Sequence, residues 1–439
     1  MGLSGVRAAV LDDDGRLLAA SRRPLRPSLA RSRAEIDPSV WLDATLGAGA
    51  EAIRMSRDVD AVAVCALGPA PLLVDASLEP LTPALLFSLD RRAESERERL
   101  GTTHDHALPK LLWWREHEPS LWRRAAWALD LTGFLVTRLT GVPVQDAITH
   151  ADYAHPAEEF PLPVPEPLEP LAHAGGLDHH VARALGLPIG TPVIAGTYDT
   201  YADIAAAGVN EPGAACVLLG STLVIGRAVE GPVECPGLEA SRYLGDGLFL
   251  GGWTATAGLA LDWFRTELGG VEDAHSVDAG AAGVLALPYF AGERTPVWDP
   301  HAGGAFVGLS LATRRADLYR ALVEGIALAA RHHLELLQGV GLAPSRWRAS
   351  GGGTQDEIWL RATCDALGAP LDVVEHAEKA VGPAVLALRA LGADVSLPVV
   401  RKVVPDPARC ARFGELYASY CELYAATAPV MHRLSRSEL

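Results

Sequence analysis

The chain has 439 residues, of which 49% are hydrophobic and 21% charged, and its formal net charge is −16. This length predicts two or three domains, and the composition excludes general disorder. The acidic balance argues against a nucleic-acid partner, because binding to phosphate backbones requires a basic surplus. The negative net charge does not exclude a small phosphorylated ligand, since such a ligand needs only a few local donors.

The six cysteines lie far apart without a CxxC pair, which indicates reduced thiols in a cytosolic protein rather than a zinc or redox site. The N-terminal residues lack the charged leader and apolar core of a signal peptide. The longest apolar stretch contains Gly68, Pro69 and Pro71 and is too short to cross a bilayer. We therefore expect a soluble, cytoplasmic protein without a membrane partner.

The first half of the chain reads as short strands followed by helices. An Asp-Gly turn predicts a hairpin between Val6–Leu11 and Leu17–Ala20. Apolar runs then predict two buried strands, at Val59–Ala66 and Leu72–Asp75. Helical periodicity predicts two helices, at Lys110–His117 and Leu121–Leu139. The stretch Phe160–Leu171 is rich in Pro and Glu and is expected to be a surface loop.

The second half repeats this mixture. An apolar strand at Pro192–Ala195 is followed by the loop GTYDT and a helix at Tyr201–Gly208. Two further strands are expected at Ala214–Leu219 and Leu223–Gly226, and Glu357–Leu367 is helix-like. The clearest helix runs from Thr313, its expected cap, to Gln338. Strands mixed with helices predict α/β domains.

Two small-residue turns each precede an apolar strand, at Gly2-Leu3-Ser4 and Gly220-Ser221-Thr222. Two copies of one domain, each with a phosphate-binding turn, would produce this pattern. Two unrelated turns would produce it equally well, because Gly-Ser turns are common. Both interpretations stay open on the residues alone.

Asp199 stands at the head of a helix, after a buried strand and a glycine loop, where α/β folds often place a catalytic carboxylate. The alternative is a helix N-cap that accepts backbone N–H bonds. The two roles are compatible, because a helix N-terminus keeps a carboxylate ionised.

Two glycine-containing segments are candidates for phosphate or nucleotide contact. Gly220-Ser221-Thr222 offers backbone N–H groups and hydroxyls of the kind that phosphoryl transfer requires. Gly351-Gly352-Gly353 lets the backbone approach a ligand closely, or forms a flexible loop. Gly292–Pro300 is interpreted as a structural loop with a Glu–Arg pair. A Walker P-loop, HExxH and GxSxG are absent from the sequence.

Together these segments resemble the FGGY carbohydrate kinases, in a xylulose kinase-like form, which belong to the actin-like ATPase superfamily. The resemblance extends over nearly the whole chain, at Pro109–Pro119, Leu139–Gly141, Val193–Thr200, Leu218–Thr222, Gly292–Pro300, Gly304–Gly325, Gly351–Pro370 and Glu378–Ala387. It implies an α/β fold of two ribonuclease H-like domains with a cleft between them. Residues 1–209 would form the sugar-binding domain and residues 210–439 the nucleotide-binding domain.

The same resemblance implies roles for individual residues. Asp199 would be the catalytic base and would help to hold Mg²⁺. The substrate would contact Asp199, Thr200, Asp90 and Gly68, although Asp90 could instead form a surface ion pair. The nucleotide would contact Gly220, Ser221, Thr222, Gly351, Gly352, Gly353 and Gln355.

Two segments depart from the family pattern. The family opens with a strand that ends in Asp-x-Gly-Thr, whereas here Met1 directly precedes Gly2, and Gly2 and Ser4 are the remnant of the first phosphate loop. Domain one is therefore expected to lack its first strand. Either the start of the sequence is placed too late, or the chain is a weakened kinase. The run Ala66–Ala70 replaces a Gln-Met-His-Gly-like segment and offers no side-chain donors.

The resemblance implies transfer of the γ-phosphoryl group of ATP, with Mg²⁺, to a hydroxyl of a small sugar, in particular a pentulose such as xylulose or ribulose. A pseudokinase that binds ATP or sugar is the alternative from another class. A polyol or glycerol kinase is a third candidate. The oligomeric state, including a homodimer, stays open.

Overall fold

The computed structural model describes residues 1–30, 32–56, 58–102, 106–153, 164–245, 247–269, 271–375 and 381–436. Its contacts divide the chain into two compact units, in agreement with the expected mixed α/β organisation. Unit 1 comprises Met1–Ala206 with the later segments Arg242–Asp246 and Ala377–Ser396, and unit 2 comprises the remainder.

Unit 1 contains several small sheets. Its strands are β1 (Val6–Leu11), β2 (Leu17–Arg23), β3 (Ser28–Ala30), β4 (Arg33–Ile36), β5 (Val62–Ala63), β6 (Pro71–Val74), β7 (Ala84–Leu85), β8 (Trp127–Asp130), β9 (Gln145–Asp146), β10 (Pro167–Leu168), β11 (His173–Gly176) and β12 (Pro192–Ile194). The hairpin β1–β2 is antiparallel, as predicted, and β12 lies between β11 and a parallel β5. Parallel pairing continues past β5 as a bridge between Ala66 and Tyr198.

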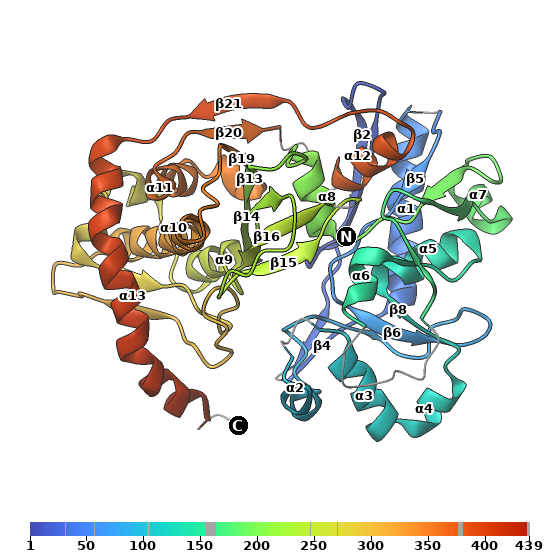
Figure 1. Cartoon of the computed structure of the whole chain (residues 1–439), viewed down its shortest axis with the longest axis horizontal. Helices are drawn as coiled ribbons and strands as arrows, with labels where there is room; N and C mark the ends of the chain where they lie inside the picture. The colour runs from blue at the N-terminus through green and yellow to red at the C-terminus, as the bar shows by residue number, and fades with distance from the viewer. Residues whose placement is uncertain are drawn as a thin grey trace. The chain divides into compact units, whose positions relative to one another are not determined.

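The helices of unit 1 are α1 (Pro38–Ser56), α2 (Glu94–Leu100), α3 (Leu108–His117), α4 (Pro119–Arg124), α5 (Leu131–Thr140), α6 (Ala147–Ala151), α7 (His179–Leu185), α8 (Asp199–Ala206) and α12 (Val381–Ala390). Helix α12 comes from the far end of the sequence, yet it packs on α8, β1 and β5 (Figure 1). Arg389 of α12 donates a hydrogen bond to the carbonyl of Ala205 at 2.9 Å. Unit 1 is therefore completed by a late segment of the chain.

Unit 2 is built on one seven-stranded sheet with the order β15-β16-β14-β13-β19-β20-β21. Its strands are β13 (Ala214–Leu219), β14 (Leu223–Val229), β15 (Glu239–Arg242), β16 (Leu248–Trp253), β19 (Arg346–Ser350), β20 (Leu371–Val374) and β21 (Val399–Val403), and β17 (Leu285–Leu287) pairs separately with β18 (Ala305–Val307). The three neighbouring strands β13, β19 and β20 are parallel. The carboxyl ends of β13 and β19 consequently meet at one edge of the sheet.

Helices cover this sheet in unit 2, namely α9 (Gly258–Glu267), α10 (Arg315–Gly339), α11 (Glu357–Leu367) and α13 (Pro407–Arg436), with the short 3₁₀ turns η1 (Glu272–Ser276), η2 (Ala281–Gly283) and η3 (Gly352–Gln355). Helices α10 and α11 pack against each other (Figure 1). Val217, Ile225, Leu322, Ala349 and Leu360 belong to their shared core with the sheet. Burying a valine, leucine or isoleucine side chain contributes about 1.5–3 kcal/mol.

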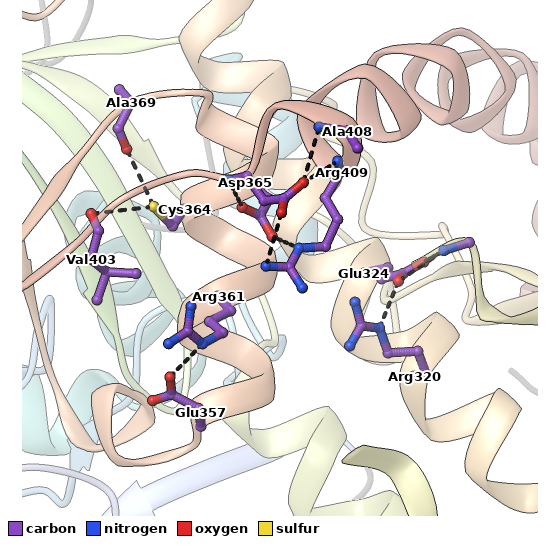
Figure 2. A network of polar contacts seen from close by, with 12 residues as sticks. Arg320, Glu324, Glu357, Arg361, Cys364, Asp365, Ala369, Val403, Ala408 and Arg409 are labelled. Carbon is purple, nitrogen blue, oxygen red and sulfur yellow. Dashed lines mark hydrogen bonds and ion pairs between the residues drawn. The ribbon is translucent and has the colours of Figure 1, made fainter. Parts of the chain in front are cut away.

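An ion pair ties α13 to α11 inside unit 2. Arg409 Nε lies 2.8 Å from the buried carboxylate of Asp365 (Figure 2). The same carboxylate accepts the backbone N–H of Asp406 at 2.8 Å. Figure 2 also shows the neighbouring pair of Arg320 and Glu324 on α10. The first turn of α13 is therefore fixed to α11 in unit 2.

Three sequence expectations were wrong in detail. The segment Leu121–Leu139 is not one helix, because β8 separates α4 from α5. Thr313 does not cap α10: the N-cap is Arg314, whose backbone N–H donates to Asp317. The strand expected at Val59–Ala66 is shortened to β5. The expected surface loop at 160–171 lies partly outside the described residues, and β10 falls within its remainder.

Candidate active site

The Asp199 loop of unit 1 is set by a glycine that no other residue could replace without rearrangement. After β12 the chain turns at Gly196, whose φ of +68° is left-handed. A Cβ there would collide with the carbonyl oxygen of Val64. The close approach places the next residues across β5, where the backbone N–H of Asp199 donates to the carbonyl of Ala66 at 2.9 Å.

Asp199 is the first residue of α8 and is half-buried. Among the described residues, the one hydrogen-bond donor to its carboxylate is the hydroxyl of Thr200, at the long distance of 3.5 Å from Oδ1. The oxygen Oδ2 points toward Gly2, where an added Cβ would lie 3.6 Å from it. The backbone of Asp199 is therefore fixed, whereas its carboxylate makes few contacts with the protein. Such a carboxylate is suited to accept a proton or to bind a cation.

Tyr198 closes one side of this region. Its hydroxyl donates to Asp152 Oδ2 at 2.6 Å. Its ring lies against Gly68, so that a Cβ added at Gly68 would overlap the ring. Burial raises the pKa of Tyr198 well above its ordinary value, and the phenol therefore stays protonated. Gly68, a predicted substrate contact, is thus covered on its Cβ side by an aromatic ring.

Two polar side chains at the start of α5 hold the loop that follows β5. Thr132 accepts the N–H of Ala66 at 3.0 Å and donates to the carbonyl of Thr197 at 3.2 Å. Asp130 Oδ2 accepts the N–H of Ala70 at 2.7 Å. Burial raises the pKa of Asp130 to about 7. A single helix terminus thereby connects the Ala66–Ala70 loop with the Asp199 loop.

Asp90 is 3% exposed and is engaged by protein groups on both oxygens. Oδ2 accepts the N–H of Ala34 at 2.8 Å, and Oδ1 accepts Arg92 Nε at 2.8 Å. Arg92 also pairs with Glu35. The Asp90 ion pair is therefore buried and not on the surface.

The N-terminal turn lies beside Asp199. Gly2 and Gly5 exchange two backbone hydrogen bonds, of 3.2 and 2.9 Å. Gly2 is buried, whereas Ser4 is exposed and its Oγ accepts from Arg7 at 3.2 Å. Of the two residues assigned to the first phosphate loop, Gly2 is the one beside the candidate base.

In unit 2 the turn Gly220–Thr222 joins β13 to β14 and faces the start of α9. The carbonyl of Gly220 accepts the N–H of Gly258 at 3.0 Å, and the carbonyl of Ser221 accepts the N–H of Ala257 at 2.9 Å. A Cβ at Gly258 would lie 2.6 Å from the Gly220 oxygen. The turn is therefore supported from behind, while the side chains of Ser221 and Thr222 stay half-exposed.

The glycine run after β19 lies against the same edge. Gly351 has φ +98° and ψ 164°, and a Cβ there would lie 2.5 Å from the carbonyl oxygen of Leu219. Gly353 packs on Trp359, whereas Gly352 and Gln355 are exposed. Because Leu218 pairs with Ser350, the structure brings Gly220–Thr222 and Gly351–Gln355 together, as the sequence could not show.

The Gly292–Pro300 loop is held mainly by backbone contacts. Glu293 Oε1 accepts the N–H groups of Ala255 at 2.6 Å and Arg294 at 2.8 Å. Burial raises the pKa of Glu293 to about 8. Thr295 Oγ1 accepts the N–H of Trp253 at 2.6 Å. The loop is thereby fastened to β16, close to the segment that leads into α9.

Sequence reasoning missed Tyr198, Asp152, Asp130 and Thr132. The only local signal was the Asp-Leu-Thr-Gly run, which is typical of a helix N-cap, and Asp130 does cap α5. The contacts of Asp130 and Thr132 with residues 66–70 and 197 span about sixty positions in sequence, which no local pattern reveals.

Comparison with known proteins gives a consistent result. The model of the N-terminal domain of the FGGY family of carbohydrate kinases matches residues 1–154, and that of its C-terminal domain matches residues 213–391. The xylulose kinase of Escherichia coli strain K12 is 27% identical over 98% of this chain and 99% of its own length. That of Bacillus subtilis strain 168 is 27% identical over 88% of this chain and 86% of its own.

Among solved structures, the xylulose kinase of Rhodospirillum rubrum superposes with a TM-score of 0.84 at 28% identity. The match covers 98% of both chains. Its two-domain architecture agrees with the α/β organisation described above.

None of the helices in the described part of the chain combines the length and apolar character needed to cross a bilayer.

Proposed function

The chain belongs to the FGGY family of carbohydrate kinases and is an ATP-dependent sugar kinase, and on that premise we propose that it phosphorylates a pentulose, xylulose in particular, with Asp199 as the catalytic base. The observation that carries the assignment is the Asp199 carboxylate, which is anchored through its backbone to Ala66 while Oδ2 accepts no hydrogen bond from a described residue. The pentulose class is supported by the relatives named xylulose kinase.

The proposed reaction moves one proton and one phosphoryl group. The substrate hydroxyl attacks the γ-phosphorus of ATP, the bond from that phosphorus to the bridging oxygen breaks, and ADP leaves. Asp199 accepts the hydroxyl proton, a contribution typically worth about 10²- to 10⁴-fold in rate. The protein otherwise provides positioning and donors for phosphate oxygens.

Each unit contributes one part of this proposal. In unit 1, Asp199 and Thr200 would contact the sugar, Gly68 would line its site, and Asp90 would act through Arg92. In unit 2, the paired ends of β13 and β19 would bind ATP, with Gly220, Ser221 and Thr222 on phosphate and Gly351–Gly353 and Gln355 on the nucleoside. The open space at Gly352, with no atom within 4 Å of an added Cβ, is compatible with a ligand there.

Magnesium fits the donors present, because the Asp199 oxygen beside Gly2 is a hard anionic ligand with no competing partner among the described residues. The metal would neutralise charge on the phosphates. Cytoplasmic location and a homodimer stay part of the proposal.

The test is a coupled assay of ADP release over D-xylulose, D-ribulose and glycerol, with the wild type, Asp199→Asn and Asp178→Asn. Asp178 is a matched control, because it is a partly exposed carboxylate that caps α7 in the same unit. We expect turnover with a pentulose, a loss of about 10²-fold or more in kcat for Asp199→Asn, and unchanged ATP affinity by calorimetry. Unchanged turnover in Asp199→Asn would contradict the assignment of the base. ATP binding without turnover on any substrate would favour a pseudokinase.

A further inference from the structure

The turn between β13 and β14, which we call the phosphate turn (Gly220–Thr222), is fixed in unit 2 through its carbonyl groups. The carbonyl of Gly220 accepts the N–H of Gly258 at 3.0 Å, and that of Ser221 accepts the N–H of Ala257 at 2.9 Å. Both donors stand at the start of α9, where a helix leaves its first N–H groups without partners of its own. The turn and the helix start therefore satisfy each other's main-chain groups.

The directions of these carbonyl groups determine where the N–H groups of the turn point. A trans peptide is planar, so that its C=O and N–H bonds point in opposite directions. The two peptide bonds of the turn are trans. Because the carbonyls of Gly220 and Ser221 point at α9, the N–H groups of Ser221 and Thr222 point away from it. Neither N–H group donates to another described residue, and successive free N–H groups of this kind suit an anion.

The segment that leads into α9 is held in turn by Glu293. This residue is buried, and its Oε1 accepts the N–H of Ala255 at 2.6 Å. The main chain of Glu293 is itself fixed, because it exchanges two hydrogen bonds with the main chain of Asp299, of 2.8 and 2.9 Å. The carboxyl group therefore connects a closed loop with the residues directly before α9.

A second contact ties the same segment, residues 254–258, which we call the strap, to the strand that follows the turn. Thr254 Oγ1 accepts the N–H of Leu223 at 2.9 Å, and the N–H of Thr254 donates to the Leu223 carbonyl at 3.0 Å. The Thr254 hydroxyl also donates to the carbonyl of Thr256 at 3.2 Å. The strap is thus anchored just before the two donors that reach the phosphate turn.

We propose that Glu293 is a positioning residue for ATP: through the strap it holds the phosphate turn so that the N–H groups of Ser221 and Thr222 face the phosphates. This inference rests on the proposed assignment of the turn to ATP. Glu293 acts through the main chain, since the same Oε1 that accepts from the strap also accepts the N–H of Arg294 at 2.8 Å. Donors that are oriented before the ligand arrives spare the cost of ordering them on binding.

The first test compares Glu293→Ala with Glu293→Gln in the full chain. Burial raises the pKa of Glu293 to about 8, so that neutral glutamine is a close substitute at pH 7 and keeps the acceptor oxygen. Calorimetry measures the affinity for ATP and for adenosine, which has no phosphate. We expect Glu293→Ala to bind ATP about tenfold more weakly, because one main-chain anchor is lost, and to bind adenosine as the wild type does. Glu293→Gln should bind both ligands like the wild type.

Three outcomes would count against this inference. Equal losses for ATP and adenosine in Glu293→Ala would indicate general damage to the fold and overturn the positioning role. Wild-type ATP affinity in the same variant would overturn it as well, while leaving the proposed function intact. A wild type that itself does not bind ATP would overturn the proposed function, and this inference with it.

Gly258→Ala tests the same connection if Glu293→Ala fails to fold. Alanine favours a helix, but its Cβ would lie 2.6 Å from the Gly220 oxygen and would push on the phosphate turn. ATP affinity should fall about tenfold or more, with adenosine affinity unchanged. Glu267→Ala is the matched control, because Glu267 is exposed at the other end of α9. Equal ATP affinity in these two variants, or a parallel loss of adenosine affinity in Gly258→Ala, would refute the proposal.

Discussion

Adjacent glycines in the run after β19 provide a sharp test of the proposed ATP site. Gly351→Ala requires a residue with φ +98° and ψ 164°, a region that is essentially restricted to glycine and costs about 1–3 kcal/mol. The new Cβ would also lie 2.5 Å from the Leu219 carbonyl oxygen, and relieving such an overlap typically costs about 1–3 kcal/mol more. Together these effects predict that the free energy of unfolding falls by about 2–6 kcal/mol.

Gly352→Ala is the matched control one residue away. No heavy atom lies within 4 Å of an added Cβ at Gly352, and its φ is not positive. Its stability should stay within about 0.5 kcal/mol of the wild type. Because relief of the overlap at Gly351 must shift the backbone beside Leu219, Gly351→Ala should also weaken ATP binding about tenfold or more, which corresponds to about 1.4 kcal/mol.

Urea unfolding followed by circular dichroism measures the stability difference, and calorimetry measures ATP affinity. Equal stability of the two variants would refute the reasoning from backbone geometry. A destabilised Gly351→Ala with wild-type ATP affinity would preserve the structural argument and refute the assignment of this run to ATP.

Three further predictions concern buried polar groups. Glu293→Gln should flatten the pH dependence of stability, because burial raises the folded pKa of Glu293 from 4.5 to about 8. As pH rises between these values, the wild type therefore loses up to about 5 kcal/mol of stability relative to the variant. Urea unfolding at pH 5 and 8 measures this difference. A constant difference between the two proteins would contradict this. Thr132→Val should lower the free energy of unfolding by about 1–3 kcal/mol and should lower kcat, because it leaves the N–H of Ala66 unsatisfied. Thr132→Ser keeps the hydroxyl and should restore both quantities. Thermal unfolding and steady-state kinetics measure them. Tyr198→Phe removes the donor to Asp152 and should alter the ratio of kcat/KM for xylulose and ribulose in the coupled assay; an unchanged ratio would show that this contact does not affect specificity.

Local patterns predicted the segments that carry the candidate site, and failed where contacts are distant. The Asp199 loop was predictable because a buried strand, a glycine turn and a helix start follow one another in sequence. The function of Thr132 was not, since its hydroxyl joins Ala66 and Thr197 across separate elements. The meeting of Gly220 and Gly351 depends on parallel pairing of β13 with β19, which the sequence does not specify.

The errors in secondary structure have the same origin. The run Leu121–Leu139 is apolar enough to suggest one helix, yet Trp127–Asp130 forms a strand because β6 is available to pair with it. The strand expected at Val59–Ala66 is regular only at β5, where β12 supports one edge. The other edge of β5 has no such neighbour among the described strands, and regular structure is correspondingly short there.

The position of α12 affects how the protein is made. Unit 1 presents α8 and β1 to a helix that begins at Val381, and the stretch between Ala206 and Val381 takes about 10–35 s to synthesise at ribosomal rates of about 5–20 residues per second. During that interval the nascent N-terminal part exposes apolar surface that only a later segment covers. Chaperone engagement during translation is therefore expected to concentrate on unit 1, and a messenger truncated within unit 2 would leave both units unfinished.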